Sequence, residues 1–186
     1  MCIRDRAHPK PIQRPWPVLI NAGHSPAAKA FSAREVDFSF VGFDSVGQVR
    51  AVAAGIRDLA RSEHRREIGV CTSALVVCRE TEAEARQVYR SIIDQGDRVA
   101  ADNLMKVLGI ESQSFNERIE KYRERLVAGW GTNPIIGTPE QVTSQLAELS
   151  AAGVDGAVFG FLDYNEELKY FDSAVMPLLR QAGLRR

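Results

Sequence analysis

Apolar residues are distributed along the chain in two recurring patterns. Short runs in which almost every residue is apolar predict strands that are buried on both faces. Between these runs, apolar residues recur at helical spacing and leave a polar face, which predicts amphipathic helices. The predicted strands are Val18–Ala22, Val36–Val41, Ile68–Cys78 and Gly156–Phe161.

The predicted helix starts carry a common signature, a Ser or Thr cap that is followed by Pro or, three residues later, by Glu or Gln. These caps are Ser25 before Pro26, Ser45 with Gln48, Thr81 with Glu84, and Thr138 before Pro139. The last helix is predicted to begin near Asn165 and to end at Gly183. Its apolar stripe, which we expect to be buried, consists of Leu168, Phe171, Val175, Leu178 and Leu179.

Strands that alternate with helices indicate parallel pairing with right-handed crossovers. Four such strands fit either a small doubly wound domain or half of an eight-stranded barrel. One stretch favours the barrel, because residues 79–137 form a single strand-to-helix connection with helices of its own, and barrel enzymes build their active sites from such connections. We therefore predict an α/β fold, the C-terminal half of a (β/α)8 TIM-type barrel with a helical insertion before the last barrel helix.

The predicted partial barrel spans residues 9–186, with the insertion at about residues 79–137. Residues 1–8 show neither periodicity nor a helix cap, and they run into a Pro-rich stretch that ends at Pro17. Stretches of that composition usually connect elements rather than begin domains. We expect residues 1–8 to be non-native or disordered.

The charge balance narrows the possible partners. With 24 basic and 24 acidic residues the formal net charge is zero, so no global field favours nucleic acid or an anionic membrane. The hydrophobic share of 45% is ordinary for a globular protein and argues against a disordered chain. No run approaches the roughly 20 apolar residues of a membrane span, and no signal-peptide core is present. We expect a cytoplasmic protein that binds neither nucleic acid nor membrane.

The cysteines give no reason to expect a disulfide or a metal centre. Cys71 and Cys78 lie seven residues apart in one apolar run, so on a strand their side chains face opposite ways. The sequence contains no Cys-x-x-Cys motif and no Cys/His ligand spacing. We expect buried free thiols and no metal site.

The turn formed by Ala22, Gly23, His24 and Ser25 is the sharpest candidate for chemistry, because a strand ends and a helix begins within it. Gly23 lets the backbone approach a ligand closely. The start of the helix offers free N–H groups and a positive partial charge beside the Ser25 hydroxyl, which together suit a phosphate. The alternative is that Ser25 only caps its helix and Gly23 only turns the chain.

Other polar positions give weaker signals. A second turn before a helix, Gly137–Glu140, contains a carboxylate that would repel an anion, which favours a plain capping box there. Trp130 either stacks on a planar ligand or covers the core. Asp163, Glu166 and Glu167 follow the last strand, where barrel enzymes often place catalytic groups, but they also form an ordinary acidic helix start. His64 is expected in solvent, and the sequence identifies no catalytic residue.

Three segments in order resemble one family. They are Pro17-Val18-Leu19-Ile20-Asn21-Ala22-Gly23-His24-Ser25-Pro26, Val76-Val77-Cys78-Arg79-Glu80-Thr81, and Gly137-Thr138-Pro139-Glu140-Gln141-Val142 continuing to Pro177-Leu178-Leu179. The chain resembles the C-terminal half of the luciferase-like flavin-dependent monooxygenases, of the alkanesulfonate, pyrimidine and dimethylsulfone monooxygenase type. The resemblance covers roughly residues 9–184.

The resemblance implies a barrel that binds reduced FMN, supplied by a separate flavin reductase, and uses oxygen to oxidise a small organic substrate. It assigns the FMN phosphate to Ala22, Gly23, His24 and Ser25, and it makes the insertion a lid. It also implies a homo-oligomer at full length. The alkanesulfonate branch has an Arg-x-His pair where this chain has Ser73 and Leu75, so a sulfonate substrate is not expected.

The family's first four strands have no counterpart in the sequence, so we expect the chain to be a fragment that is inactive alone. Two alternatives stay open. One is an oxidoreductase on the same fold that uses a deazaflavin for hydride transfer. The other is a non-catalytic barrel subunit that pairs with another chain.

Overall fold

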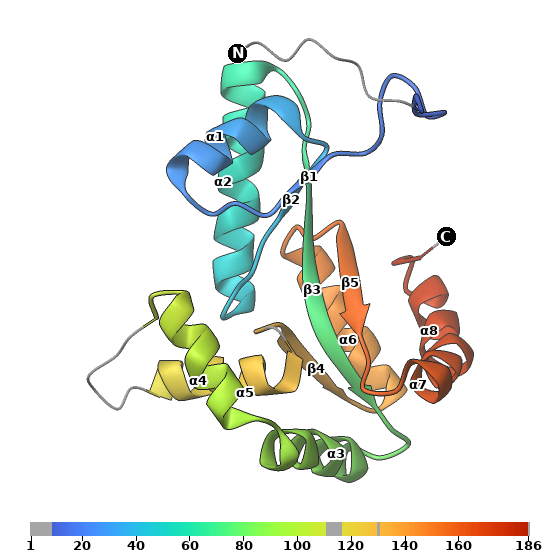
Figure 1. Cartoon of the computed structure of the whole chain (residues 1–186). Coiled ribbons are helices and arrows are strands. Elements are labelled where there is room, and N and C mark those ends of the chain that lie inside the picture. The colour runs from blue at the N-terminus through green and yellow to red at the C-terminus, as the bar shows by residue number, and fades with distance from the viewer. Residues whose placement is uncertain (1–8, 111–116, 130, 186) are drawn as a thin grey trace.

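The computed structural model describes residues 9–110, 117–129 and 131–185, so the expectations for residues 1–8 and Trp130 lie outside it. Figure 1 shows the chain as helices around a few parallel strands. The elements are β1 (Ile20–Asn21), α1 (Pro26–Glu35), β2 (Phe38–Phe40), α2 (Val46–His64), β3 (Gly69–Cys78), α3 (Glu82–Gln95), α4 (Arg98–Val107), α5 (Glu117–Gly129), β4 (Asn133–Gly137), α6 (Pro139–Ala151), β5 (Gly156–Gly160), α7 (Tyr164–Tyr170), a π-helical segment (Phe171–Val175) and α8 (Met176–Gln181).

Strand β3 organises the sheet. Within the described residues the sheet has five strands, all of them parallel to their neighbours, and β3 pairs with β2, β4 and β5. β5 occupies one edge of β3 from Cys71 to Leu75, so β2 and β4 follow one another along the opposite edge. The succession β1–β2–β3–β5, with helices in between, is the neighbour order of consecutive barrel strands. The parallel α/β fold class is thereby confirmed.

Strand β4 was not predicted. It pairs residue by residue with the end of β3, from Ala74 with Asn133 to Cys78 with Gly137. Its sequence, Asn-Pro-Ile-Ile-Gly, is too short and too rich in Pro and Gly to read as a strand by pattern alone. The prediction of a four-stranded sheet was therefore wrong by one strand.

The main core lies on one face of the sheet. Alternate β3 residues, among them Val70, Ala74 and Val76, pack there with helices α1, α2 and α6 and with α8. On the opposite face the C-terminal half of β3 is covered instead by α3, whose Ala85 forms a second cluster with Leu75 and Val77. The two clusters explain why β3 is buried almost throughout.

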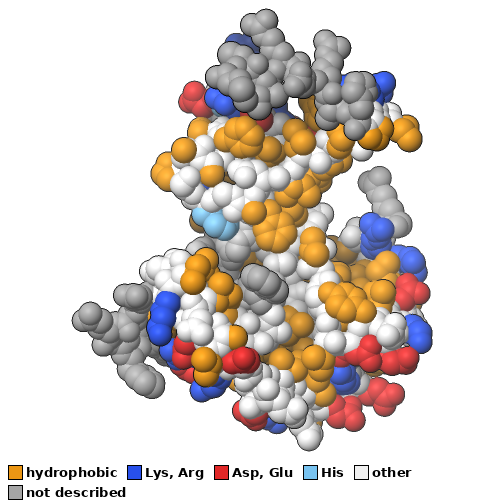
Figure 2. Space-filling model, viewed as in Figure 1, with side chains coloured by type: hydrophobic (Ala, Val, Ile, Leu, Met, Phe, Trp, Pro, Cys, Tyr) orange, Lys and Arg blue, Asp and Glu red, His pale blue; other side chains and the backbone are white. Residues whose placement is uncertain are grey.

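The prediction that Val18–Ala22 is a buried strand was wrong. β1 has only two paired residues, and Val18 and Ile20 are 51% and 59% exposed. Val158 of β5, on the sheet face that also carries Ser73, is 61% exposed. The reason is that no described element covers this face near β1 and β5 or pairs with their outer edges. Figure 2 shows apolar side chains reaching the surface across this side of the molecule.

The helix caps follow the predictions with one exception. Ser25 caps α1, and Thr81 and Thr138 each complete a reciprocal capping box. Ser45 caps α2, but the Gln48 side chain accepts from the Asp44 N–H (2.6 Å) instead of the Ser45 N–H. The predicted capping box at Ser45 is therefore wrong in its second half.

The last predicted helix is broken by the π-helical segment, which separates α7 from α8. Phe171, Val175 and Leu179 are buried as expected, whereas Leu178 is only half-buried. Leu168 is 49% exposed, against the prediction, because it lines an open cavity and is not packed into the core. Among the described residues, none of the helices combines the length and the apolar character that crossing a bilayer requires.

Candidate functional site

A cavity of about 470 Å³ opens where one edge of β3 changes partner. β2 pairs with β3 as far as Cys71 and β4 begins at Ala74, so Thr72 and Ser73 have no strand beside them on that edge. We call this space the gap cavity. Its lining comes from the β1–α1 turn, α1, the β2–α2 loop, β3, α5 and β4: Ala22, His24, Lys29, Phe40, Val41, Gly42, Phe43, Asp44, Gln48, Val52, Thr72, Ser73, Tyr122, Arg125, Gly131, Thr132 and Asn133.

Two of the four predicted site residues, Ala22 and His24, line the gap cavity. Gly23 lines an adjoining cavity of about 360 Å³ between α1 and α2, to which His24 also contributes. Ser25 is exposed and lies at the start of α1 next to this turn. The turn therefore sits at the carboxyl end of β1, on the face where parallel α/β proteins bind ligands.

The turn is held in shape by Asn21, which sequence reasoning did not single out. Its amide nitrogen donates to Ser32 Oγ (2.8 Å) and to the Ala28 carbonyl (3.3 Å). Its amide oxygen accepts the Gly23 N–H at 3.4 Å. Asn21 thus connects the end of β1, the turn and α1 through one side chain.

Gly23 has a structural reason to be glycine that involves no ligand. A Cβ at this position would lie 2.4 Å from the Cβ of Ala28, so any side chain would collide with α1. Glycine here permits close packing of the turn on the helix. The presence of Gly23 is therefore weaker support for a ligand than the sequence pattern suggested.

Ser25 makes the N-cap that its position predicted. Its Oγ accepts the Ala28 N–H at 3.2 Å, and the hydroxyl keeps a proton that it can donate. One helical turn later, Lys29 lines both the gap cavity and the adjoining cavity. The sequence shows that Lys29 follows Ser25 at the spacing i, i+4, which places both on one face of the helix. It does not show the cavity that Lys29 lines.

Arg125 is the second cation that sequence reasoning missed. It comes from α5, more than eighty residues from the β2–α2 loop, yet its Nη1 lies 3.2 Å from Asp44 Oδ1 and 3.3 Å from the Phe43 carbonyl oxygen. Its side chain is only 15% exposed. Asn133 donates to the same Phe43 carbonyl at 2.6 Å. These bonds fasten α5 and β4 to the loop after β2 and close one wall of the gap cavity.

The second predicted turn is a plain helix start, as expected. Gln141 Oε1 accepts the Thr138 N–H at 2.9 Å, and Thr138 Oγ1 donates to Glu140 at 2.8 Å. That hydrogen bond lowers the pKa of Glu140, which favours a negative charge beside the helix start. A carboxylate at this position disfavours an anionic ligand at the turn, as the sequence predicted.

The carboxylates after β5 have separate roles. Asp163 caps α7 and accepts the Asn165 N–H (2.9 Å), while Glu166 lies in solvent with Lys169. Both agree with an ordinary helix start. Glu167 does not, because its side chain is 10% exposed and pairs with Arg79. His64 is exposed, as expected.

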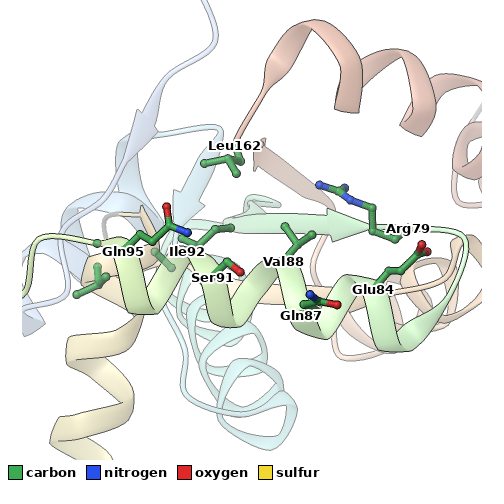
Figure 3. Close-up of a pocket in the computed structure, with 11 residues that line it drawn as sticks. Arg79, Glu84, Gln87, Val88, Ser91, Ile92, Gln95 and Leu162 are labelled. Atoms are coloured by element: carbon green, nitrogen blue, oxygen red, sulfur yellow. The ribbon is translucent and has the colours of Figure 1, made fainter.

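A second cavity, of about 620 Å³, lies between α3 and the loop after β5. Figure 3 shows Leu162 facing the α3 side chains across it, with Arg79 at one end. We call it the α3 pocket. Among the residues that the structure describes, no group of three or more His, Cys, Asp or Glu side chains could hold a metal ion.

Comparison with known proteins places these features in context. Residues 4–156 match the family model described as luciferase-like monooxygenase. The chain is 36% identical over 190 residues to an FMNH2-dependent dimethylsulfone monooxygenase of Pseudomonas putida, covering 96% of this chain and 50% of that protein. It is 26% identical over 167 residues to the pyrimidine monooxygenase RutA of Acinetobacter baylyi, covering 87% of this chain and 45% of that protein.

The fold has close counterparts among solved structures. The crystal structure of DmoA from Hyphomicrobium sulfonivorans superposes with a TM-score of 0.77 at 20% sequence identity, covering 91% of this chain and 42% of that chain. The chain thus spans about half the length of the curated relatives it matches. This likeness supports a half-barrel architecture for the strands β1, β2, β3 and β5.

Proposed function

The chain belongs to the luciferase-like monooxygenase family, and from this premise we propose that it forms part of a monooxygenase that uses reduced FMN and oxygen to oxidise a small organic substrate. The observation that carries the proposal is the convergence of His24, Lys29 and the start of α1 on a cavity at the carboxyl ends of β1 and β2. The names of the curated relatives, FMNH2-dependent dimethylsulfone monooxygenases, support the same cofactor.

The residues of the turn fit the phosphate of FMN. A phosphate beside Ala22, Gly23, His24 and Ser25 would meet the positive end of α1, a hydroxyl that can donate, and the Lys29 ammonium one turn along the helix. Asn21 would hold this turn in a fixed geometry, so that little ordering remains to be done when the phosphate binds.

Reduced flavin, delivered by a separate reductase, would supply the oxidising chemistry with oxygen, and the protein would supply binding, orientation and exclusion of water. In the gap cavity that last task falls to the α5–β4 wall, which Arg125 and Asn133 fasten to Phe43. The α5–β4 part of the segment between β3 and α6 would therefore cover the flavin, in the place where the family resemblance puts a lid.

The substrate we propose is not a sulfonate. Ser73, which lines the gap cavity, and Leu75, which is 6% exposed and packs against α3, stand where an Arg-x-His pair would serve a sulfonate. Neither side chain can bind an anionic head group through charge.

The first test compares FMN with riboflavin, which lacks the phosphate, by fluorescence titration of the protein that contains this chain. We expect FMN to bind at least tenfold more tightly. Lys29→Ala should remove most of this preference, since a hydrogen bond to a charged group contributes about 1.5–3 kcal/mol. Arg34→Ala is the matched control: it removes another exposed cation from α1, outside the gap cavity, and should leave the preference intact. Equal binding of FMN and riboflavin would refute the phosphate assignment.

A second measurement separates the alternatives by activity. Conversion of dimethyl sulfone to an oxidised product, dependent on reduced FMN, oxygen and the protein, would support the monooxygenase. Hydride transfer from a reduced deazaflavin without oxygen uptake would support the oxidoreductase alternative. Failure to bind any flavin, together with stable hetero-oligomers, would favour a non-catalytic subunit.

A further inference from the structure

The α3 pocket lies at the carboxyl ends of β3 and β5, on the same face as the gap cavity but on the other side of α5. Tyr122 and Arg125 of α5 line the gap cavity, whereas Val127 and Ala128 line the α3 pocket. The face that carries active sites in parallel barrels is thus divided into two chambers by one helix.

The α3 pocket offers no unpaired cation to an anionic ligand. Arg79 Nη2 lies 2.5 Å from Glu167 Oε1, and Nη1 donates to the Cys78 carbonyl at 2.7 Å. Glu84 accepts from the N–H (3.3 Å) and hydroxyl (3.1 Å) of Thr81. Both charged side chains in the lining are therefore engaged within the protein, and the remaining lining residues are uncharged.

The rest of the lining combines an apolar floor with a polar rim. Val88 and Ile92 pack on the second core cluster and form the floor, and Leu162 faces them (Figure 3). Gln87, Ser91 and Gln95 lie on the exposed side of the same helix and offer amide and hydroxyl groups. A volume of about 620 Å³ lies within the range of pockets that bind small organic ligands.

We propose that the α3 pocket binds an uncharged organic molecule that has a hydrogen-bond acceptor and alkyl groups longer than methyl. The acceptor would meet Gln87, Ser91 or Gln95, and the alkyl groups would lie on Val88 and Ile92. Because α5 separates the α3 pocket from the gap cavity, a ligand bound here would not lie at the flavin, and its link to the monooxygenase reaction rests on the proposed function. Its chemical class rests on the lining alone, so the two can be tested separately.

The test uses the protein with and without added FMN and three probes: dimethyl sulfone, di-n-propyl sulfone and propane-1-sulfonate, each measured by ligand-observed NMR titration. Each buried methylene should strengthen binding about fourfold, so the dipropyl compound should bind at least tenfold more tightly than the dimethyl compound. Propane-1-sulfonate should not displace it. Ser91→Trp, which fills the pocket, should weaken dipropyl sulfone binding at least tenfold. Arg90→Trp, an exposed position of the same helix outside the lining, should not.

Ser91→Asp is a second variant, needed in case the tryptophan variant folds poorly. Because Ser91 is exposed, an aspartate should be accommodated there without loss of the fold. The introduced charge should weaken sulfone binding several-fold. Unchanged sulfone affinity in both Ser91 variants, or a sulfonate that binds as tightly as the dipropyl sulfone, would overturn the proposal. The FMN titration tests the proposed function independently. A protein that binds the sulfone but not FMN would contradict the proposed function and would still support the α3 pocket as a binding site.

Discussion

Arg79 and Glu167 join the ends of two strands through an ion pair of 2.5 Å between Nη2 and Oε1. Arg79 follows β3 directly, and Glu167 lies in the helix after β5. The second carboxylate oxygen of Glu167 accepts the N–H groups of Leu162 (2.8 Å) and Asp163 (3.1 Å). One side chain therefore fixes the loop after β5 against the end of β3 and positions one wall of the α3 pocket.

Glu167→Ala should lower the free energy of unfolding by about 2 kcal/mol, because it leaves Arg79 and two backbone N–H groups without their partner. Urea denaturation would measure the loss. Glu166→Ala, one residue earlier, is the control, since Glu166 and Lys169 form a pair that is largely in solvent and such pairs contribute about 0–1 kcal/mol. Equal effects of the two substitutions would show that the Arg79–Glu167 pair contributes little.

Gly23→Ala should destabilise the protein by about 1–3 kcal/mol through the collision with Ala28. Adding Ala28→Gly should recover part of this loss, limited by the cost of about 1 kcal/mol for glycine in a helix. Gly55→Ala is a contrasting case, because Gly55 lies inside α2 with open space where its Cβ would be, and it should stabilise. Thermal unfolding of these three variants measures the effects, and a double variant no more stable than Gly23→Ala alone would contradict the packing explanation.

Cys78 should make stability fall at high pH. Burial raises the pKa of its thiol from 9.0 to about 11 in the folded protein. Below pH 9 the thiol is neutral in both states, so its contribution is complete. Between pH 9 and 11 the thiol ionises only in the unfolded chain, so stability declines as the pH rises through this window.

The control for this prediction is Cys78→Ala, in which that part of the pH dependence should disappear. Urea midpoints at pH 8 and pH 10.5 would measure it. Identical pH profiles for the two proteins would mean that Cys78 is not the group responsible. Alkylation by iodoacetamide at pH 8 should also be slow in the native protein, since the thiolate is the reactive form.

The chain produced on its own should self-associate through β1 and β5. Both strands have unpaired outer edges within the described residues, and Ile20 and Val158 expose apolar side chains beside them. Ile20→Lys together with Val158→Lys should raise the monomer fraction in size-exclusion chromatography. A monomeric chain that melts cooperatively without these substitutions would count against the half-barrel interpretation.

The elements that the sequence predicted well are those whose signals are local. The continuous apolar run of β3 and the caps at Ser25, Thr81 and Thr138 need no knowledge of neighbours. β4 could not be predicted, because what makes Asn133–Gly137 a strand is the free edge of β3 next to it. The exposure of β1 was missed for the same reason: its pattern is that of a buried strand, and no described neighbour buries it.

The candidate site was predicted only in part. The turn at Ala22–Ser25 is contiguous, so its helix start and its glycine were readable as a unit. Lys29 is close to this turn in sequence, but only the structure shows that it lines the cavity. Arg125 reaches the same cavity from a helix far along the chain. Glu167 looked like any acidic residue at a helix start until the fold placed Arg79 beside it.

The two ends of the segment between β3 and α6, residues 79–137, lie next to each other at the carboxyl end of β3. The Arg79 N–H donates to the Gly137 carbonyl at 3.1 Å, and Cys78 pairs in register with Gly137. A segment held in this way can be exchanged as a unit, or cassette, because its length and content can change while its two ends stay paired at the carboxyl ends of β3 and β4. Relatives could therefore diverge in what they bind by replacing the cassette, without moving β3 or the turn at Ala22–Ser25.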